Sequence, residues 1–103
     1  MDLNVIKKDG RREKFSREKL FKGIAKSLEK RPFTSEQIEE IVDDVEARIY
    51  RIAKDKDIKG SKIGEIVMAK LEKVDKVAYI RFASVYREFK SIDEFKKELK
   101  KLK

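Results

Sequence analysis

The sequence predicts an α+β fold in which a small N-terminal β-hairpin lies over an antiparallel helical bundle with a short C-terminal helix. Asp9-Gly10 stands between two short runs that mix apolar and basic residues, which is typical of a tight hairpin turn. The rest of the chain carries apolar residues at helical spacing, in segments that capping residues separate. A chain of 103 residues is expected to form one domain with a modest hydrophobic core.

The first two helices have clear boundaries in the sequence. Ser16 is expected to cap a helix over about residues 17–30. Arg31-Pro32 stops this helix, because the residue before a proline is disfavoured in the α region. Thr34-Ser35-Glu36-Gln37 is a capping box, and it predicts a second helix that extends to about residue 53.

Residues 54–60 are expected to form a polar connector that leads to three further helices. Ser61 and Asp75 are the predicted caps of the third and fourth helices. A second capping box, Ser91-Ile92-Asp93-Glu94, predicts the short terminal helix. The apolar face of the fourth helix is expected to carry Val77, Ile80, Ala83 or Ser84, and Phe89.

The composition excludes several classes of function. The chain has no cysteine and no histidine, so disulfides, Cys/His zinc sites, cysteine nucleophiles and histidine acid–base catalysis are excluded. It has no apolar run long enough to span a membrane and no signal-peptide core, so we expect a cytoplasmic protein without membrane contact.

The net charge of +8 is unevenly distributed along the chain. Residues 1–31 carry a net charge of +6, and residues 32–57 carry −4. This asymmetry favours an anionic partner on one side of the molecule, although a charge-rich surface is also typical of thermophilic proteins. We interpret the carboxylate pairs Glu39-Glu40 and Asp43-Asp44 as a solvated helix surface rather than a catalytic pair.

The predicted hairpin presents five cationic side chains on one small platform, namely Lys7, Lys8, Arg11, Arg12 and Lys14. Such a platform suits a polyphosphate. The sequence has no glycine-rich phosphate-binding loop, so a phosphate must be held by side-chain cations and by a helix N-terminus. Gly60-Ser61 offers such an N-terminus, and the alternative is an ordinary helix start.

The predicted fourth helix combines aromatic rings with guanidinium groups. Tyr79, Phe82 and Tyr86 are three and four residues apart and share a face, with Arg81 and Arg87 nearby. The rings could stack on a base while the arginines neutralise phosphates. Alternatively, the rings belong to the core and the arginines extend into solvent. The pattern does not decide between these two interpretations.

These residues resemble a known family. The sequence VIKKDGRREKF at 5–15, followed by EKL at 18–20, resembles the opening of the ATP-cone domain. LEKRP at 28–32 and KVAYIRFASVYR at 76–87 resemble one branch, the ATP-cone of the bacterial transcriptional repressor of ribonucleotide reductase genes. The resemblance covers about residues 3–95.

The resemblance implies a regulatory, non-catalytic site for ATP or dATP between the hairpin and the helices, at which the bound nucleotide sets the oligomeric state. It divides the chain into an ATP-cone at 1–91 and a helical extension at 92–103. By this resemblance ten residues are expected to bind the nucleotide: Val5, Ile6, Lys7, Lys8, Glu13, Lys19, Gly60, Ser61, Tyr86 and Arg87.

Within this set, Lys7 and Lys8 match paired cations at the phosphates. The second of these is usually arginine in the family, so Lys8 lacks the bidentate fork. Val5 and Ile6 match the strand that borders the base. Glu13 matches a contact to the base or sugar.

The other five residues are carried over from the same resemblance. Lys19 matches a contact to phosphate. Gly60 falls where related cones often have threonine, so a hydroxyl contact would move to Ser61. Tyr86 and Arg87, on the predicted fourth helix, are carried over as further contacts.

The resemblance also predicts which ions and partners the chain binds. We expect Mg²⁺ to bridge the phosphates, without a metal site on the protein, and we expect a homo-oligomer. The repressors carry a four-cysteine zinc ribbon ahead of the cone, whereas this sequence starts at Met1 directly before it and has no cysteine, so DNA binding is not expected. It also lacks the reductase barrel, so enzymatic activity is not expected.

Two alternatives stay open: a small basic nucleic-acid-binding protein, and a pure interaction module with Phe95, Leu99 and Leu102 as its oligomer seam.

Overall fold

The computed structural model describes residues 2–102 and shows a mixed arrangement of strands and helices, which confirms the predicted α+β class. In chain order the elements are β1 (Asn4–Ile6), β2 (Arg12–Lys14), α1 (Arg17–Ser27), α2 (Ser35–Ile52), β3 (Asp57–Lys59), α3 (Gly60–Val74), α4 (Lys76–Tyr86) and α5 (Ile92–Lys100).

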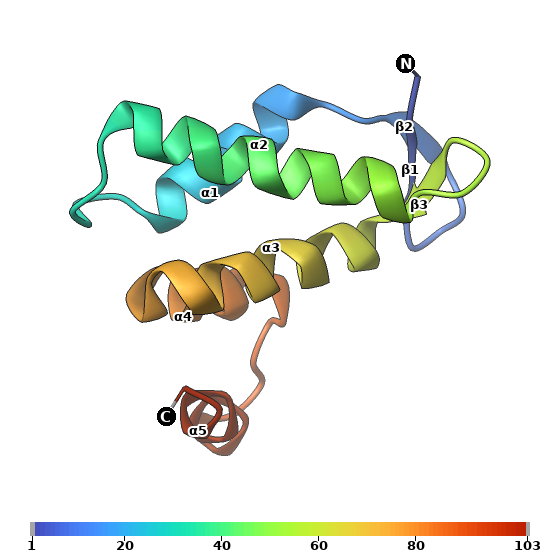
Figure 1. Cartoon of the computed structure of the whole chain (residues 1–103). Coiled ribbons are helices and arrows are strands. Elements are labelled where there is room, and N and C mark those ends of the chain that lie inside the picture. Colours follow the sequence, from blue (N-terminus) through green and yellow to red (C-terminus); the bar gives the residue numbers. More distant parts are fainter. Residues whose placement is uncertain (1, 103) are drawn as a thin grey trace.

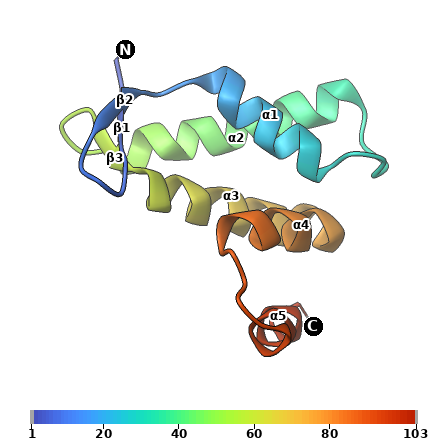
Figure 2. The same ribbon diagram turned by 180° about the vertical axis from the view of Figure 1, so that it is seen from behind.

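The helices form two layers with the small sheet at one end (Figure 1). The α1 and α2 helices make one layer, α3 and α4 make the other, and consecutive helices in these layers run antiparallel (Figures 1 and 2). The α5 helix lies on the outer side of the second layer and crosses the direction of the other helices (Figure 1). No helix within residues 2–102 is long and apolar enough to cross a membrane.

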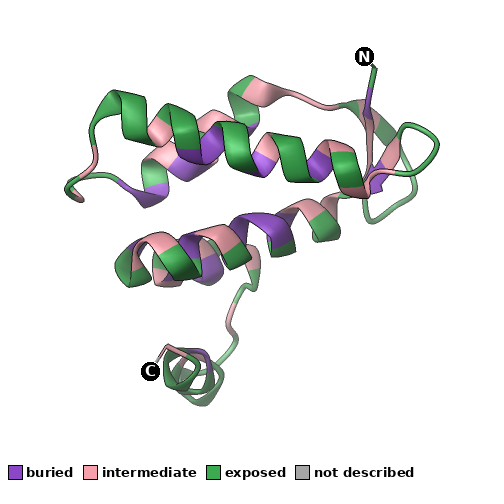
Figure 3. Cartoon of the chain, viewed as in Figure 1, coloured by how far each residue is buried: buried purple, intermediate pink, exposed green. Residues whose placement is uncertain are grey.

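The hydrophobic core lies between the two layers, where the buried stripes of the helices face one another (Figure 3). Its seven largest fully buried side chains are Ile24, Leu28, Val42, Val45, Ile49, Val67 and Leu71. These residues stand at helical spacing within their segments, so the periodicity of the sequence accounts for the way the layers pack.

The sheet has three strands in the order β2-β1-β3, so the prediction that residues 54–60 form only a polar connector was wrong. Asp55 and Lys56 adopt positive φ angles of 52° and 65° and turn the chain back after α2. The turn places β3 parallel to β1, with Val5 opposite Ile58. Ile58 is 5% exposed and anchors the strand in the core.

Two helix boundaries differ from the predictions. The α1 helix ends at Ser27 instead of residue 30, because Leu28 already leaves the helical region and Lys30 has a positive φ of 61°. The α3 helix begins at Gly60, so Ser61 lies in its first turn and does not cap it. The predicted capping box at Thr34 is confirmed by reciprocal hydrogen bonds with Gln37 of 2.8 and 3.1 Å.

The buried face of α4 differs from the prediction in part. Ala78, Tyr79 and Ala83 are buried, whereas Val77 is 39% exposed. The small alanines allow α4 to approach the neighbouring helices closely, and Tyr79 reaches the α5 helix. The predicted apolar face was therefore right at Ala83 and wrong at Val77, and Ile80 and Phe89 are partly buried against the core.

A buried carboxylate anchors α5 to α4. Glu98 is 3% exposed, accepts a hydrogen bond from the Tyr79 hydroxyl, and pairs with the Arg87 Nε at 3.0 Å. At the start of α5, Ser91 accepts from the Glu94 N–H at 3.2 Å, as predicted. The Glu94 carboxylate accepts from Lys90 rather than from the cap residue itself, so the second capping box is only half formed.

The acidic surface of α2 is exposed, as predicted, and it also binds an arginine of α1. The Arg17 guanidinium binds Glu46, Asp43 and Glu39 together. The hydrogen bond to Glu46, followed by those to the other two carboxylates, raises the pKa of Arg17. This cluster ties the start of α1 to α2. The Glu39 and Asp43 side chains are 55% and 63% exposed, so the predicted solvated surface is confirmed, with Arg17 bound on it.

Replacing Tyr79 by phenylalanine is expected to lower the free energy of unfolding by about 1.5 kcal/mol at neutral pH, because a hydrogen bond to a charged carboxylate is lost. Burial, together with Glu98, raises the pKa of Tyr79 to about 12. A phenol with a higher pKa in the folded state stabilises fully below its unfolded pKa of about 10, and this stabilisation is lost as the pH rises toward the folded value.

Urea denaturation of both proteins between pH 8 and pH 12 measures this effect. The advantage of the wild type over the variant should shrink above about pH 10. An advantage that stays constant over this range would contradict the assigned role of the hydroxyl.

Candidate functional site

A cavity of about 270 Å³ lies where the hairpin meets α1, α3 and α4; we call it the hairpin cavity. Lys7, Lys14 and Lys19 line one part of it. Apolar side chains from three helices line another part, including Ile24, Ile63, Val67 and Phe82. The cavity therefore combines a cationic edge with an apolar interior, the combination that a ligand with an anionic group and a flat apolar group requires.

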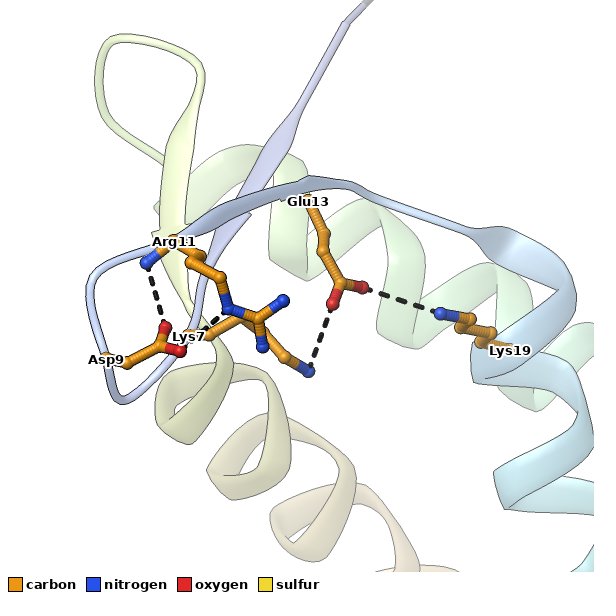
Figure 4. A network of polar contacts seen from close by, with 5 residues as sticks. All are labelled: Lys7, Asp9, Arg11, Glu13 and Lys19. Atoms are coloured by element: carbon orange, nitrogen blue, oxygen red, sulfur yellow. Dashed lines mark hydrogen bonds and ion pairs between the residues drawn. The ribbon is translucent and has the colours of Figure 1, made fainter.

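The hairpin that covers this cavity is held in place by polar contacts. The Arg11 side chain binds Asp9 at 2.7 Å, and the Arg11 N–H donates to the same carboxylate at 3.0 Å (Figure 4). These bonds, the backbone one first, lower the pKa of Asp9. Arg12 reaches across β1 to Asp57 of β3 at 3.1 Å. The turn and the sheet together fix the position of the cationic platform.

Glu13 lies between two of the lysines (Figure 4). Its carboxylate oxygens are 3.9 Å from the Lys7 Nζ and 3.4 Å from the Lys19 Nζ. The Glu13 side chain is 36% exposed and the Lys19 side chain 79% exposed. Ion pairs this open to solvent contribute little to stability. A ligand with a higher negative charge can therefore replace Glu13 between the two cations.

One wall of the hairpin cavity is formed by α3 and α4, and this wall depends on a close approach of the two helices. The Tyr86 ring lies against Gly64, and its hydroxyl donates to the Ser61 carbonyl oxygen at 2.6 Å. Phe82 stacks on Tyr86 with ring centroids 6.0 Å apart and an interplanar angle of 19°. Burial raises the pKa of Tyr86. The wall is thus aromatic and remains uncharged at neutral pH.

The structure brings six of the ten predicted site residues to the hairpin cavity: Val5, Lys7, Glu13, Lys19, Gly60 and Tyr86. The other four lie near it without lining it. Lys8 is exposed in the turn, and Ile6 contributes its backbone oxygen beside Gly60. Ser61 offers its carbonyl to the tyrosine, and Arg87 pairs with Glu98 and, at 3.5 Å, with Glu65.

The two interpretations of the fourth helix each hold for some of its residues. Tyr79 belongs to the core, whereas Phe82 and Tyr86 line the cavity. Arg81 does not reach the cavity, because it donates to the carbonyls of Ser27 and Glu29 at 3.2 and 2.7 Å. It caps the C-terminal end of α1 instead.

The sequence analysis did not identify several residues that line the hairpin cavity. Lys14 was recognised as part of the cationic platform but not as a site residue. Gly23 and Gly64, both inside helices, also line the cavity. Glycine in a helix interior is unfavourable, and this was the signal that could have marked both positions.

Comparison with known proteins gives one family. Residues 3–92 match the ATP cone domain. Transcriptional repressor NrdR from Desulforapulum autotrophicum is 55% identical over 102 residues, which cover 99% of this chain and 61% of that protein. The protein of the same name from Acetivibrio thermocellus is 51% identical, with 99% and 67% covered. That from Listeria welshimeri is 55% identical, with 97% and 64% covered.

The chain thus spans about 61–67% of the length of these relatives, which are named as repressors and not as enzymes. This agrees with the prediction of a non-catalytic domain. The matched region contains the hairpin, all four helices of the two layers and every residue that lines the hairpin cavity. The chain belongs to the ATP-cone domain family.

Proposed function

We propose that this chain is a regulatory domain that binds ATP or dATP in the hairpin cavity, and that the bound nucleotide controls its oligomeric state. The observation that carries the proposal is the hairpin cavity itself, with its three lysines and its aromatic wall, in a member of the ATP-cone family. Cations that converge on one edge of an apolar cavity suit a ligand with phosphates at one end and a base at the other.

The phosphates are assigned to the lysine edge. Lys7 and Lys19 already share the Glu13 carboxylate, so two cations converge on one anionic group. Lys14 lines the same cavity, and the exposed side chain of Lys8 stands next to Lys7 in the turn. A triphosphate would replace Glu13 there, which would free this carboxylate to accept a hydrogen bond from the sugar or base.

Magnesium is proposed to enter with the nucleotide. No group of three or more His, Cys, Asp or Glu side chains that could hold a metal ion exists in the described part of the chain, residues 2–102. Mg²⁺ is commonly bound through substrate phosphates and water rather than by a cage of protein ligands. Bridging by the phosphates themselves therefore fits these side chains.

Control of assembly follows from differential binding. A nucleotide shifts an assembly equilibrium only by the difference in its affinity for the two states. Exposed apolar side chains on α4 and α5 support an association surface: Val85 is 79% exposed and Ile92 is 72% exposed. Since the relatives are transcriptional repressors, we propose that this assembly serves transcriptional repression, with no DNA contact assigned to residues 2–102.

The test is the double variant Lys7→Ala, Lys8→Ala. We expect it to weaken ATP binding by roughly a hundredfold or more, because two charge-assisted contacts to phosphate are lost. Calorimetric titration with ATP and dATP in the presence of Mg²⁺ measures the affinities. Lys96→Ala, Lys97→Ala is the matched control, since it removes an adjacent lysine pair from the exposed face of α5 with the same change in net charge.

Circular dichroism should show unchanged helicity in both double variants. Equal ATP affinity in the two would refute the phosphate assignment. Light scattering with and without nucleotide tests the second half of the proposal, which requires the mass to change. A wild type that ignores nucleotides but binds nucleic acid with a steep salt dependence would favour the nucleic-acid alternative instead.

A further inference from the structure

A second cavity, of about 340 Å³, lies between α1 and α4; we call it the α1–α4 cavity. Lys26, Arg81 and Val85 are among the residues that line it. Gly23 and Phe82 line both this cavity and the hairpin cavity. The two cavities therefore meet along a short boundary made by the backbone of α1 on one side and an aromatic ring of α4 on the other.

Gly23 has no steric reason within the protein to be glycine. It lies inside α1, where glycine is less favourable than alanine. A Cβ atom built at this position would meet no heavy atom within 4 Å. Gly64 presents the opposite case, since its Cβ would lie 2.0 Å from the Tyr86 ring. In the absence of a ligand, the space beside Gly23 is therefore empty, and it lies at the junction where the two cavities adjoin.

The size of the hairpin cavity also supports a ligand that reaches the space beside Gly23. Sites for small organic ligands commonly measure about 300–1,000 Å³. The hairpin cavity, at about 270 Å³, lies just below that range. A nucleoside triphosphate with its phosphates at the lysine edge must extend beyond this cavity, and the α1–α4 cavity adjoins it at the shared lining residues Gly23 and Phe82.

The chemistry of the junction suits a flat, uncharged ring. Phe82 offers an aromatic face, and Ile24 lies next to Gly23 on the hairpin-cavity side. The nearest guanidinium group, that of Arg81, is already bound to the carbonyls of Ser27 and Glu29. An aromatic ring that stacks on Phe82 would approach α1 closely at the one position without a side chain.

We infer that Gly23 is a specificity-determining residue of the nucleotide site: the purine base lies between its backbone and the Phe82 ring and extends toward the α1–α4 cavity. This inference rests on the proposed function. It assigns to Gly23 a role in admitting the base, whereas the lysines at the other end hold the phosphates.

Gly23→Ala tests the inference because it should change stability and affinity in opposite directions. In the absence of ligand, the added methyl enters open space and favours the helix, so the melting temperature should rise by about 4–8 °C. The same methyl group occupies part of the space between Gly23 and Phe82 that is proposed for the base, so ATP should bind about tenfold or more weakly. Sodium tripolyphosphate, which carries phosphates without a base, should bind the variant and the wild type equally.

Ser84→Ala serves as the matched control. It is an uncharged substitution in the interior of an α-helix, on an exposed position of α4 that lines neither cavity. This variant should bind ATP as the wild type does. All titrations are run at low ionic strength, where the phosphate contacts are least screened.

Two results would overturn the inference: unchanged ATP affinity in Gly23→Ala, or an equal loss of affinity for ATP and tripolyphosphate. The melting temperature of the variant shows whether it is folded. A wild type that fails to bind ATP would instead refute the proposed function, and the inference would fall with it.

Discussion

Asp75→Ala is expected to lower the free energy of unfolding by about 3 kcal/mol, from the loss of a helix cap and of a buried ion-pair partner. Asp75 caps α4 by accepting from the Ala78 N–H at 2.9 Å. The same carboxylate binds the Arg31 guanidinium at 2.9 Å, and its side chain is only 7% exposed. It therefore joins the corner between α3 and α4 to the loop between α1 and α2, and alanine would break both connections.

The pH dependence of this effect has a definite sign. Burial acts to raise the pKa of Asp75, but the Ala78 N–H and the Arg31 guanidinium outweigh it and hold the pKa below its usual range. A carboxyl with a lowered folded pKa stabilises above its unfolded pKa of about 3.9, and this stabilisation is lost as the pH falls through the folded value. The difference between wild type and variant should thus decrease in strongly acidic solution.

Urea denaturation from pH 7 down to pH 2 measures both the size and the pH dependence. Asp93→Ala is the matched control, because it removes an exposed acidic residue from the first turn of α5. Asp75→Asn adds a further comparison, since this variant keeps a cap acceptor but loses the charge. A cost for Asp75→Ala no larger than that of Asp93→Ala would contradict the role assigned here.

The helices were predictable because their signals are local. Thr34 and Asp75 cap helices through contacts three residues away, and these contacts need only the neighbouring sequence. The β3 strand was missed because it is three residues long and depends on a partner more than fifty residues away, with Val5 opposite Ile58. An isolated segment of this length carries no periodicity that could reveal it.

The candidate site was predictable mainly on the hairpin side, and the helices added three predicted residues that line the cavity, namely Lys19, Gly60 and Tyr86. Lys7 and Glu13 follow a sequence pattern around the turn, and both line the cavity. Gly23 and Phe82 contribute from two helices whose relative rotation decides what faces the cavity. For α4 the prediction was wrong at Val77, which is exposed, and it left open whether Tyr79 belongs to the core, where it is buried. The residues that sequence reasoning missed, such as Gly23 and Gly64, lie inside helices and reach the cavity only through helix packing.

Gly64→Ala is expected to lower the free energy of unfolding by about 2 kcal/mol, within the usual cost of overpacking a core. In an unobstructed helix the same change would stabilise by about 1 kcal/mol. Here the new Cβ would lie 2.0 Å from the Tyr86 ring. The ring would have to leave its place, with loss of the hydrogen bond to Ser61 and of the stack on Phe82.

A double-mutant cycle with Tyr86→Ala isolates this contact by urea denaturation. Once the ring is removed, Gly64→Ala should change sign and stabilise the protein, as Gly23→Ala should in the wild type. Equal destabilisation in both backgrounds would mean that some other neighbour restricts position 64. Because Tyr86 also lines the hairpin cavity, the single variant Gly64→Ala should weaken ATP binding as well. Glycine-to-alanine substitution is therefore expected to lower the affinity for ATP at both positions. At position 64 the methyl group displaces the Tyr86 ring, and at position 23 it occupies space proposed for the base. The effects of the two substitutions on stability are opposite.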